Sequence, residues 1–178
     1  MLARTLAIAS VLAAAALLPA AAHGQNFVGA DKCKTCHNAK DKGEMHTKWK
    51  ASPHAKAHDT LAGAEAKKLD KGADAAKDAK CLKCHDTEAA TSPDKLAKSF
   101  KGEQGVQCES CHGPGEKHVK ARMASEEDNN VTDAEIAMNP AEKTCATCHN
   151  KESPSFKGLK YAEMVKKIEH KNPSKKSK

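Results

Sequence analysis

The sequence predicts an all-α fold in which short helices alternate with much irregular structure. No segment shows the alternation of apolar and polar residues that is typical of a half-buried β-strand. Near the C-terminus, Tyr161, Met164, Val165 and Ile168 follow helical spacing and predict an amphipathic helix. The 178 residues include three Phe, one Trp and one Tyr, so the side chains alone offer little material for a hydrophobic core.

The cysteines indicate what fills the interior instead. All eight fall in four copies of the pentapeptide C-x-x-C-H, at residues 33–37, 81–85, 108–112 and 145–149. This pattern is the attachment signal of c-type haem, in which two thiols bind one porphyrin and the next histidine binds its iron. We therefore predict four covalent haems held by Cys33, Cys36, Cys81, Cys84, Cys108, Cys111, Cys145 and Cys148, with the irons on His37, His85, His112 and His149.

Two other uses of paired cysteines are zinc sites and disulfide frameworks. Neither needs a histidine directly after every second cysteine, and the chain has ten histidines in 178 residues, so four such placements by chance are very improbable. Haem attachment is the favoured interpretation. Stacked haems then form the core, and we expect the haem-free chain to be largely unfolded.

The irregular spacing of the four motifs favours one compact unit over a tandem array. Four macrocycles in so small a protein lie nearly edge to edge, so electrons can pass among them. The formal net charge of +7 resembles a nucleic-acid signal, but each ferric c-haem contributes about −1, so four haems offset much of it. We expect no nucleic-acid partner.

Residues 1–24 predict a signal peptide. Arg4 precedes the uncharged apolar run 6–18, and small residues follow at 20–22. We expect export to the periplasm and one tetrahaem cytochrome c domain over 25–178. An uncleaved anchor is the alternative, but the apolar run is short for a span, so no stable membrane span is expected.

Several elements between the motifs can be anticipated. Ser52 followed by Pro53 predicts a helix entry that leads through His54 to His58. Residues 61–80 indicate a frayed helical spacer, and residues 132–135 resemble a capping box that starts a short helix. The basic tail, residues 171–178, is either a solubilising end or a docking patch for an acidic redox partner.

The second axial ligand of each iron decides whether a haem carries electrons or binds a small molecule. Outside the motifs and the leader boundary, five histidines can supply it: His46, His54, His58, His118 and His170. The helix entry beside Trp49 favours His54. A turn at residues 113–115 could bring His118 back across a neighbouring haem.

Three segments resemble the tetrahaem cytochrome c-554 family. They are Gly105–Gly115 around the third motif, Trp49 with His54-Ala-Lys-Ala after the first, and Ser153–Gly158 followed by Glu163–Lys166 after the fourth. The resemblance covers essentially the whole chain after the leader. It implies stacked haem pairs in a mainly helical periplasmic protein that accepts electrons from hydroxylamine oxidoreductase.

The resemblance also implies a ligand set. His118 would close the first haem, His54 the third and His170 the fourth, while the iron on His85 would be five-coordinate. On a continuous helix His170 falls about 180° from Tyr161, so the chain must unwind near residue 169 or the fourth haem has another ligand. Either His46 or His58 could still close the iron on His85.

The leading functional hypothesis is a periplasmic tetrahaem electron carrier that is not an enzyme. Its expected partners are a multihaem oxidoreductase as donor and a cytochrome as acceptor. One alternative is a reductase of nitric oxide, nitrite or hydroxylamine at an open iron on His85. Another is a haem filament, in which a histidine of one subunit binds the haem of the next.

Overall fold

The computed structural model describes residues 25–124 and 140–173. Within these ranges it holds helices and no β-sheet; Phe27 and Leu96 form one isolated parallel bridge. The all-α prediction is confirmed. The predicted signal peptide and the short helix at 132–135 lie outside the described residues. The α-helices are α1 (Ala30–His37), α2 (Met45–Ala51), α3 (Ala64–Leu69), α4 (Ala79–His85), α5 (Cys108–His112), α6 (Glu116–Ala124), α7 (Glu142–Ala146) and α8 (Tyr161–Ile168).

Each C-x-x-C-H motif lies on a short helix or at its end. Helices α1 and α4 end at their motif histidines, α5 consists of the third motif, and α7 carries Cys145 with His149 three residues beyond the helix. In a helix, residues three and four positions apart share a face. The helical turn therefore directs both thiols and the histidine of a motif to the same side.

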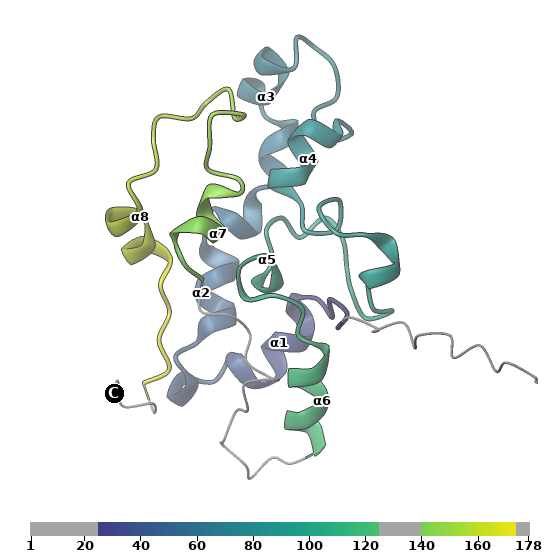
Figure 1. Cartoon of the computed structure of the whole chain (residues 1–178), viewed down its shortest axis with the longest axis vertical. Helices are drawn as coiled ribbons and strands as arrows, with labels where there is room; N and C mark the ends of the chain where they lie inside the picture. Colours follow the sequence, from purple (N-terminus) through teal and green to yellow (C-terminus); the bar gives the residue numbers. More distant parts are fainter. Residues whose placement is uncertain (1–24, 125–139, 174–178) are drawn as a thin grey trace, which may run out of the picture.

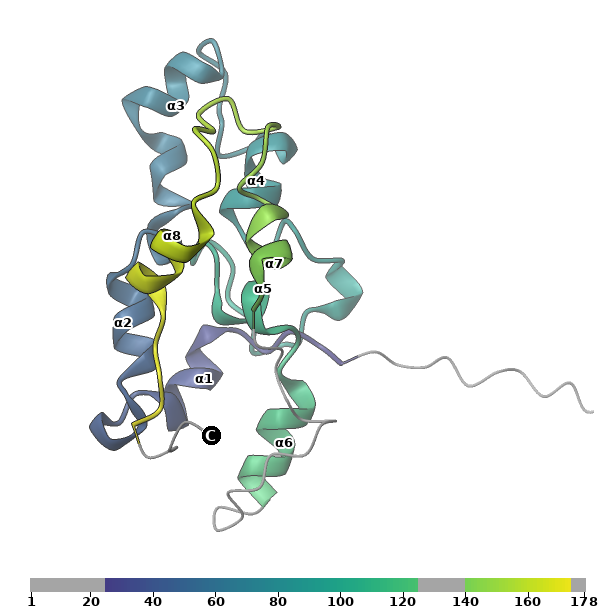
Figure 2. The ribbon, with the colours of Figure 1, turned by 60° about the vertical axis from the view of Figure 1, so that its left-hand side comes forward.

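The motif helices gather in the middle of the molecule (Figure 1). Helix α7 lies beside α5 in both views, whereas α3 and α6 occupy opposite ends (Figures 1 and 2). The chain after α8 runs along α2 toward α1, where the backbone of Lys171 lies against Gly43. Segments far apart in the sequence thus surround the same central region.

The segment after Ser52 is helical but not one α-helix. It forms two 3₁₀ turns, η2 (His54–Lys56) and η3 (Asp59–Ala62), followed by α3. Two further 3₁₀ turns are η1 (Lys40–Lys42) and η4 (Pro93–Lys95). The predicted entry at Pro53 is confirmed, since the backbone there is already helical. The spacer prediction was too long, because α3 ends at Leu69 and Gly72 adopts a φ of 88° that favours glycine.

The predicted C-terminal helix is confirmed as α8, which ends at Ile168. Glu169 adopts an extended conformation with a ψ of 139°. The helix therefore ends before His170. This agrees with the expectation that the chain must unwind near residue 169 if His170 is to bind a haem.

The polypeptide has little apolar core of its own. In the described ranges the buried apolar residues are Val28, Ala30, Ala55, Leu61 and Ala75, and three of these are alanines. Four polar residues are equally buried: Asp86, Thr87, Gln107 and Glu109. None of the helices in residues 25–124 and 140–173 is long and apolar enough to span a bilayer.

Candidate haem sites

Three pairs of histidine rings face one another at close range; one pair is stacked, one is edge-on and one is tilted. The ring centroids are 6.0 Å apart for His37 and His118, 6.1 Å for His54 and His149, and 5.8 Å for His112 and His170. Each pair combines a motif histidine with one from outside the motifs. The remaining motif histidine is His85.

The ring spacing fits an iron between each pair. A metal–imidazole bond is about 2 Å long and the ring centre lies about 1 Å behind the nitrogen, so two axial histidines have centroids about 6 Å apart. None of the eight cysteines forms a disulfide, so all of them are left for thioether attachment to porphyrins. In the described residues, no group of three or more Cys, His, Asp or Glu side chains is arranged to hold a metal ion.

The turn between α5 and α6 positions His118. Gly113 there has a φ of 77°, a conformation that glycine adopts without strain. Asn26 pairs with Glu116 at the start of α6 through N–H to Oε2, at 3.0 Å. These contacts direct α6 so that His118 faces His37, as the resemblance implies.

Contacts from the segment before the third motif position His54. Its carbonyl accepts a hydrogen bond from the N–H of Val106 at 2.9 Å, and the indole N–H of Trp49 donates to the Val106 carbonyl at 2.8 Å. Gly105 has a φ of 68°, and a Cβ there would lie 2.5 Å from the His54 carbonyl oxygen. The glycine therefore permits the close backbone approach that holds His54 in place.

The ligand pairs implied for the third and fourth haems are exchanged in the structure. His54 faces His149 of the fourth motif rather than His112, and His170 faces His112 rather than His149. The unwinding after Ile168 explains the second pair. The Nδ1 of His170 lies 3.0 Å from the Ile168 carbonyl, which turns the rest of the ring away from α8 and toward α5.

The surroundings of His85 differ from those of the other motif histidines. Its Nδ1 donates to the carbonyl of Ala57 at 2.9 Å and lies 3.3 Å from the hydroxyl of Thr60. A second-shell bond of this kind fixes the tautomer and leaves Nε2 for a metal. Among the described residues, no histidine ring faces that of His85.

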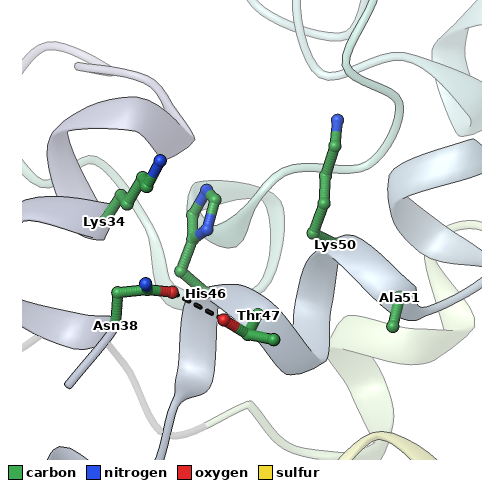
Figure 3. A pocket seen from close by; sticks show the side chains of 6 residues that line it. All are labelled: Lys34, Asn38, His46, Thr47, Lys50 and Ala51. Atoms are coloured by element: carbon green, nitrogen blue, oxygen red, sulfur yellow. Dashed lines mark hydrogen bonds between the residues drawn. The ribbon is translucent and has the colours of Figure 1, made fainter.

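His58 and His46 have partners other than His85 in the structure. His58 lies between Ala57 and Thr60, the two residues whose groups contact Nδ1 of His85. The Nδ1 of His58 is 2.8 Å from a carboxylate oxygen of Asp86. His46 lies on α2 against the first motif helix, not the second (Figure 3).

His46 lines an open pocket between α1 and α2 with a volume of about 430 Å³ (Figure 3). Lys34 and Lys50 flank it, and Asn38 accepts a hydrogen bond from Thr47 at its floor, at 2.7 Å. Burial, followed by the charge of Lys34, lowers the pKa of His46. The imidazole is thus held neutral beside two lysines.

The thiols reveal which motifs are neighbours. Cys33 and Cys108 are hydrogen-bonded, which raises the pKa of Cys33 and lowers that of Cys108. Burial and the adjacent thiol of Cys148 raise the pKa of Cys84 to about 11. The first motif therefore lies against the third, and the second against the fourth.

A further contact links the two pairs. Burial, together with the nearby thiols of Cys145 and Cys148, raises the pKa of Cys111 to about 11. The four motifs thus follow the spatial order first, third, fourth, second. Burial also lowers the pKa of His37 and of His54, which favours the neutral imidazole that binds iron.

Sequence reasoning missed a set of buried polar residues beside the third motif. Gln107 and Glu109 are 1% and 3% exposed and hydrogen-bond to the chain that leads into α1. Thr87 accepts from the N–H of Gln107 at 2.7 Å. Glu109 occupies a position that C-x-x-C-H leaves unspecified, so the motif carries no signal for it.

Comparison with known families supports the site. Residues 32–113 match the family model described as cytochrome c554 and c-prime, a range that contains the first three motifs in full. No curated protein and no solved structure matches the chain significantly. Residues 32–113 thus belong to the cytochrome c554 and c-prime family, and this match supports a haem c electron-transfer protein with covalently bound haem.

Proposed function

We propose that this protein is a periplasmic tetrahaem cytochrome that transfers electrons between redox proteins and has no substrate of its own. The observation that carries the proposal is the set of three facing histidine pairs, each with centroids 5.8 to 6.1 Å apart. The fourth motif lies outside the family match, but its His149 faces His54 as the others face their partners. Four haems follow from four equivalent motifs.

The order of the motifs in space supports a linear electron path. Neighbouring thiols link the first motif to the third, the third to the fourth, and the fourth to the second. When bound, c-type haem supplies a one-electron couple at each position. Electrons would therefore enter or leave at the haems of the first and second motifs, which form the ends of the path.

The paired histidines suit a carrier. Two imidazoles close an iron to other ligands, and bound haem then changes its oxidation state with little rearrangement. The expected donor is a multihaem oxidoreductase and the expected acceptor a cytochrome, with exposed lysines steering both in a salt-dependent way. The predicted leader supports a periplasmic location; cell fractionation that finds the holoprotein in the cytoplasm would contradict it.

Intact-mass spectrometry of the exported holoprotein tests the haem number. We expect the mass of the processed chain plus four covalently bound tetrapyrroles. Replacing Cys145 and Cys148 by alanine should remove one of the four increments. A wild-type mass with three increments that the Cys145 and Cys148 variant retains would mean that the fourth motif carries no haem. A bare peptide mass would contradict the proposal.

A second candidate function is reduction of nitric oxide, nitrite or hydroxylamine at the iron on His85. The supporting observation is that no described histidine ring faces His85, and that its Nδ1 is held by Ala57. Carbon monoxide titration of the reduced protein distinguishes the candidates. Binding to one haem in four supports an open iron at His85, whereas no binding eliminates the reductase.

A further inference from the structure

Glu109 is a buried carboxylate that lies between the two cysteines of the third motif. It is 3% exposed. A buried charge is stable when it is fully hydrogen-bonded, and Glu109 meets this condition with backbone donors alone. Its role is not explained by haem attachment, which uses Cys108, Cys111 and His112.

Three backbone N–H groups donate to this carboxylate. The N–H of Val28 lies 2.8 Å from Oε1 and 3.0 Å from Oε2, that of Gly29 lies 2.7 Å from Oε2, and that of Gly115 lies 2.7 Å from Oε1. Both oxygens accept hydrogen bonds, which is the pattern that fits the ionised form. The three donors come from two segments almost 90 residues apart.

These bonds fix the first motif against the third. Val28 and Gly29 directly precede α1, and Gly115 directly precedes α6, which carries His118. Gln107 adds a parallel connection: its Oε1 accepts from the N–H of Ala30 at 2.8 Å, and its Nε2 donates to the Lys101 carbonyl at 2.8 Å. The carboxylate is therefore joined to the start of both helices that provide ligands to the first iron.

The same carboxylate is close to the attachment points of two haems. Its negative charge acts on the thiols of both Cys33 and Cys108, where it opposes their ionisation. The charge thus lies at the junction of the first and third motifs and away from Cys84 and Cys148.

We infer that Glu109 is a positioning and charge-setting residue for the haems of the first and third motifs. Its hydrogen bonds hold the two motifs together, and its fixed negative charge lowers the reduction potentials of this pair below the values they would have without it. This inference depends on the proposed tetrahaem function.

The physical basis is the difference in charge between the two oxidation states. Ferric haem carries one positive charge more than ferrous haem, so a nearby anion stabilises the ferric state. Inside a protein the effective dielectric constant is far below that of water, so the effect is larger than at the surface. Removing the Glu109 charge should therefore raise the potentials of the first and third haems and leave those of the more distant second and fourth haems unchanged.

The test is a potentiometric titration of Glu109→Gln holoprotein, followed by nuclear magnetic resonance of haem methyl groups so that each haem is observed separately. Gln keeps the volume and removes the charge. We expect the potentials of the first and third haems to shift upward while those of the second and fourth stay unchanged. Four unchanged potentials, or an equal shift of all four, would overturn the inference.

Glu142→Gln is the matched control, because Glu142 is an exposed carboxylate three residues before Cys145 of the fourth motif. We expect no shift at any haem. Intact mass is measured first on every variant, so that a missing haem, which would contradict the proposed function, is distinguished from an unshifted potential, which would contradict the role of Glu109.

Two further variants distinguish the effect of the hydrogen-bond geometry from the effect of the charge. They also test the inference if Glu109→Gln holoprotein does not accumulate. Gly115→Ala places a Cβ 3.2 Å from Oε1 of Glu109, and Glu109→Asp shortens the side chain; both keep the charge. We expect faster hydrogen exchange at residues 26–30 with the potentials retained. A large upward shift in either variant would show that geometry rather than charge sets the potentials and would overturn the inference.

Discussion

The two neighbouring pairs of motifs are held together by different means. A buried network joins the first motif to the third through Gln107 and Glu109, which are 1% and 3% exposed. Between the second and fourth motifs the structure places an ion pair of Lys83 and Glu152, whose side chains are 49% and 70% exposed. The polypeptide therefore fixes the first pair of haem sites itself, whereas the second pair relies more on the haems.

The difference extends to the irons. We call the first and third motifs, which Gln107 and Glu109 join, the clamped pair. Both of its motif histidines face a partner, His37 with His118 and His112 with His170. In the other pair, His149 faces His54, but among described residues no histidine faces His85. The less constrained pair is thus also the one in which a ligand could reach an iron.

The largest expected effect comes from removing the haems, which should abolish the difference between the pairs. The described residues include five buried apolar side chains, and three are alanines, so the chain alone has too little apolar burial to offset its conformational entropy. Haem-free protein produced without the attachment machinery should show a largely unfolded far-ultraviolet circular dichroism spectrum. A native-like helical spectrum would contradict this expectation.

The next effect converts a closed iron of the clamped pair into an open one. His118→Ala removes the ring that faces His37, so one further haem should become high-spin and bind carbon monoxide after reduction. The control is His46→Ala. The ring of His46 contacts Trp49 and lines the pocket between α1 and α2, and it does not face a motif histidine. An additional carbon-monoxide-binding haem in His46→Ala but not in His118→Ala would reverse the assignment.

A smaller effect is expected from the buried network. Gln107→Ala leaves the buried N–H of Ala30 without its partner and removes a part-buried hydrogen bond to the Lys101 carbonyl. The loss should destabilise the holoprotein by about 1 to 3 kcal/mol, which is the cost of one unsatisfied buried group. Denaturant unfolding followed at the haem absorption band measures it. A midpoint equal to that of the wild type would show that the network contributes little.

The smallest effect is expected at the exposed ion pair. Lys83→Met removes the charge that faces Glu152, but water and salt screen this pair. The unfolding midpoint should stay within experimental error of the wild type in physiological salt. If Lys83→Met destabilises the protein as much as Gln107→Ala, the contrast between the two pairs is wrong.

The sequence was most informative where chemistry needs fixed spacing. C-x-x-C-H predicts the attachment residues because the thiols and the histidine must share one helical face, and Tyr161 to Ile168 predicts α8 because its apolar stripe is continuous. The ligand pairs could not be predicted in the same way. The partner of His170 depends on where α8 unwinds and on how residues over 50 positions apart pack, which no local pattern encodes.

The buried carboxylate was equally invisible in the sequence. Glu109 is one of 23 acidic residues, and its burial depends on three N–H groups from residues 28, 29 and 115. The requirement for glycine at residue 105 was also invisible in the sequence, since it follows from the close approach of the His54 backbone. Local patterns thus predicted which groups bind haem, and tertiary contacts determine how the haems are arranged.

Electron paramagnetic resonance of the fully oxidised holoprotein, with spin quantification against its iron content, tests the central claim most directly. Three facing histidine pairs and an unpaired His85 predict three low-spin ferric haems and one high-spin ferric haem per chain. Four low-spin irons would mean that a further ligand closes the haem on His85, and two or more high-spin irons would contradict the histidine pairs themselves.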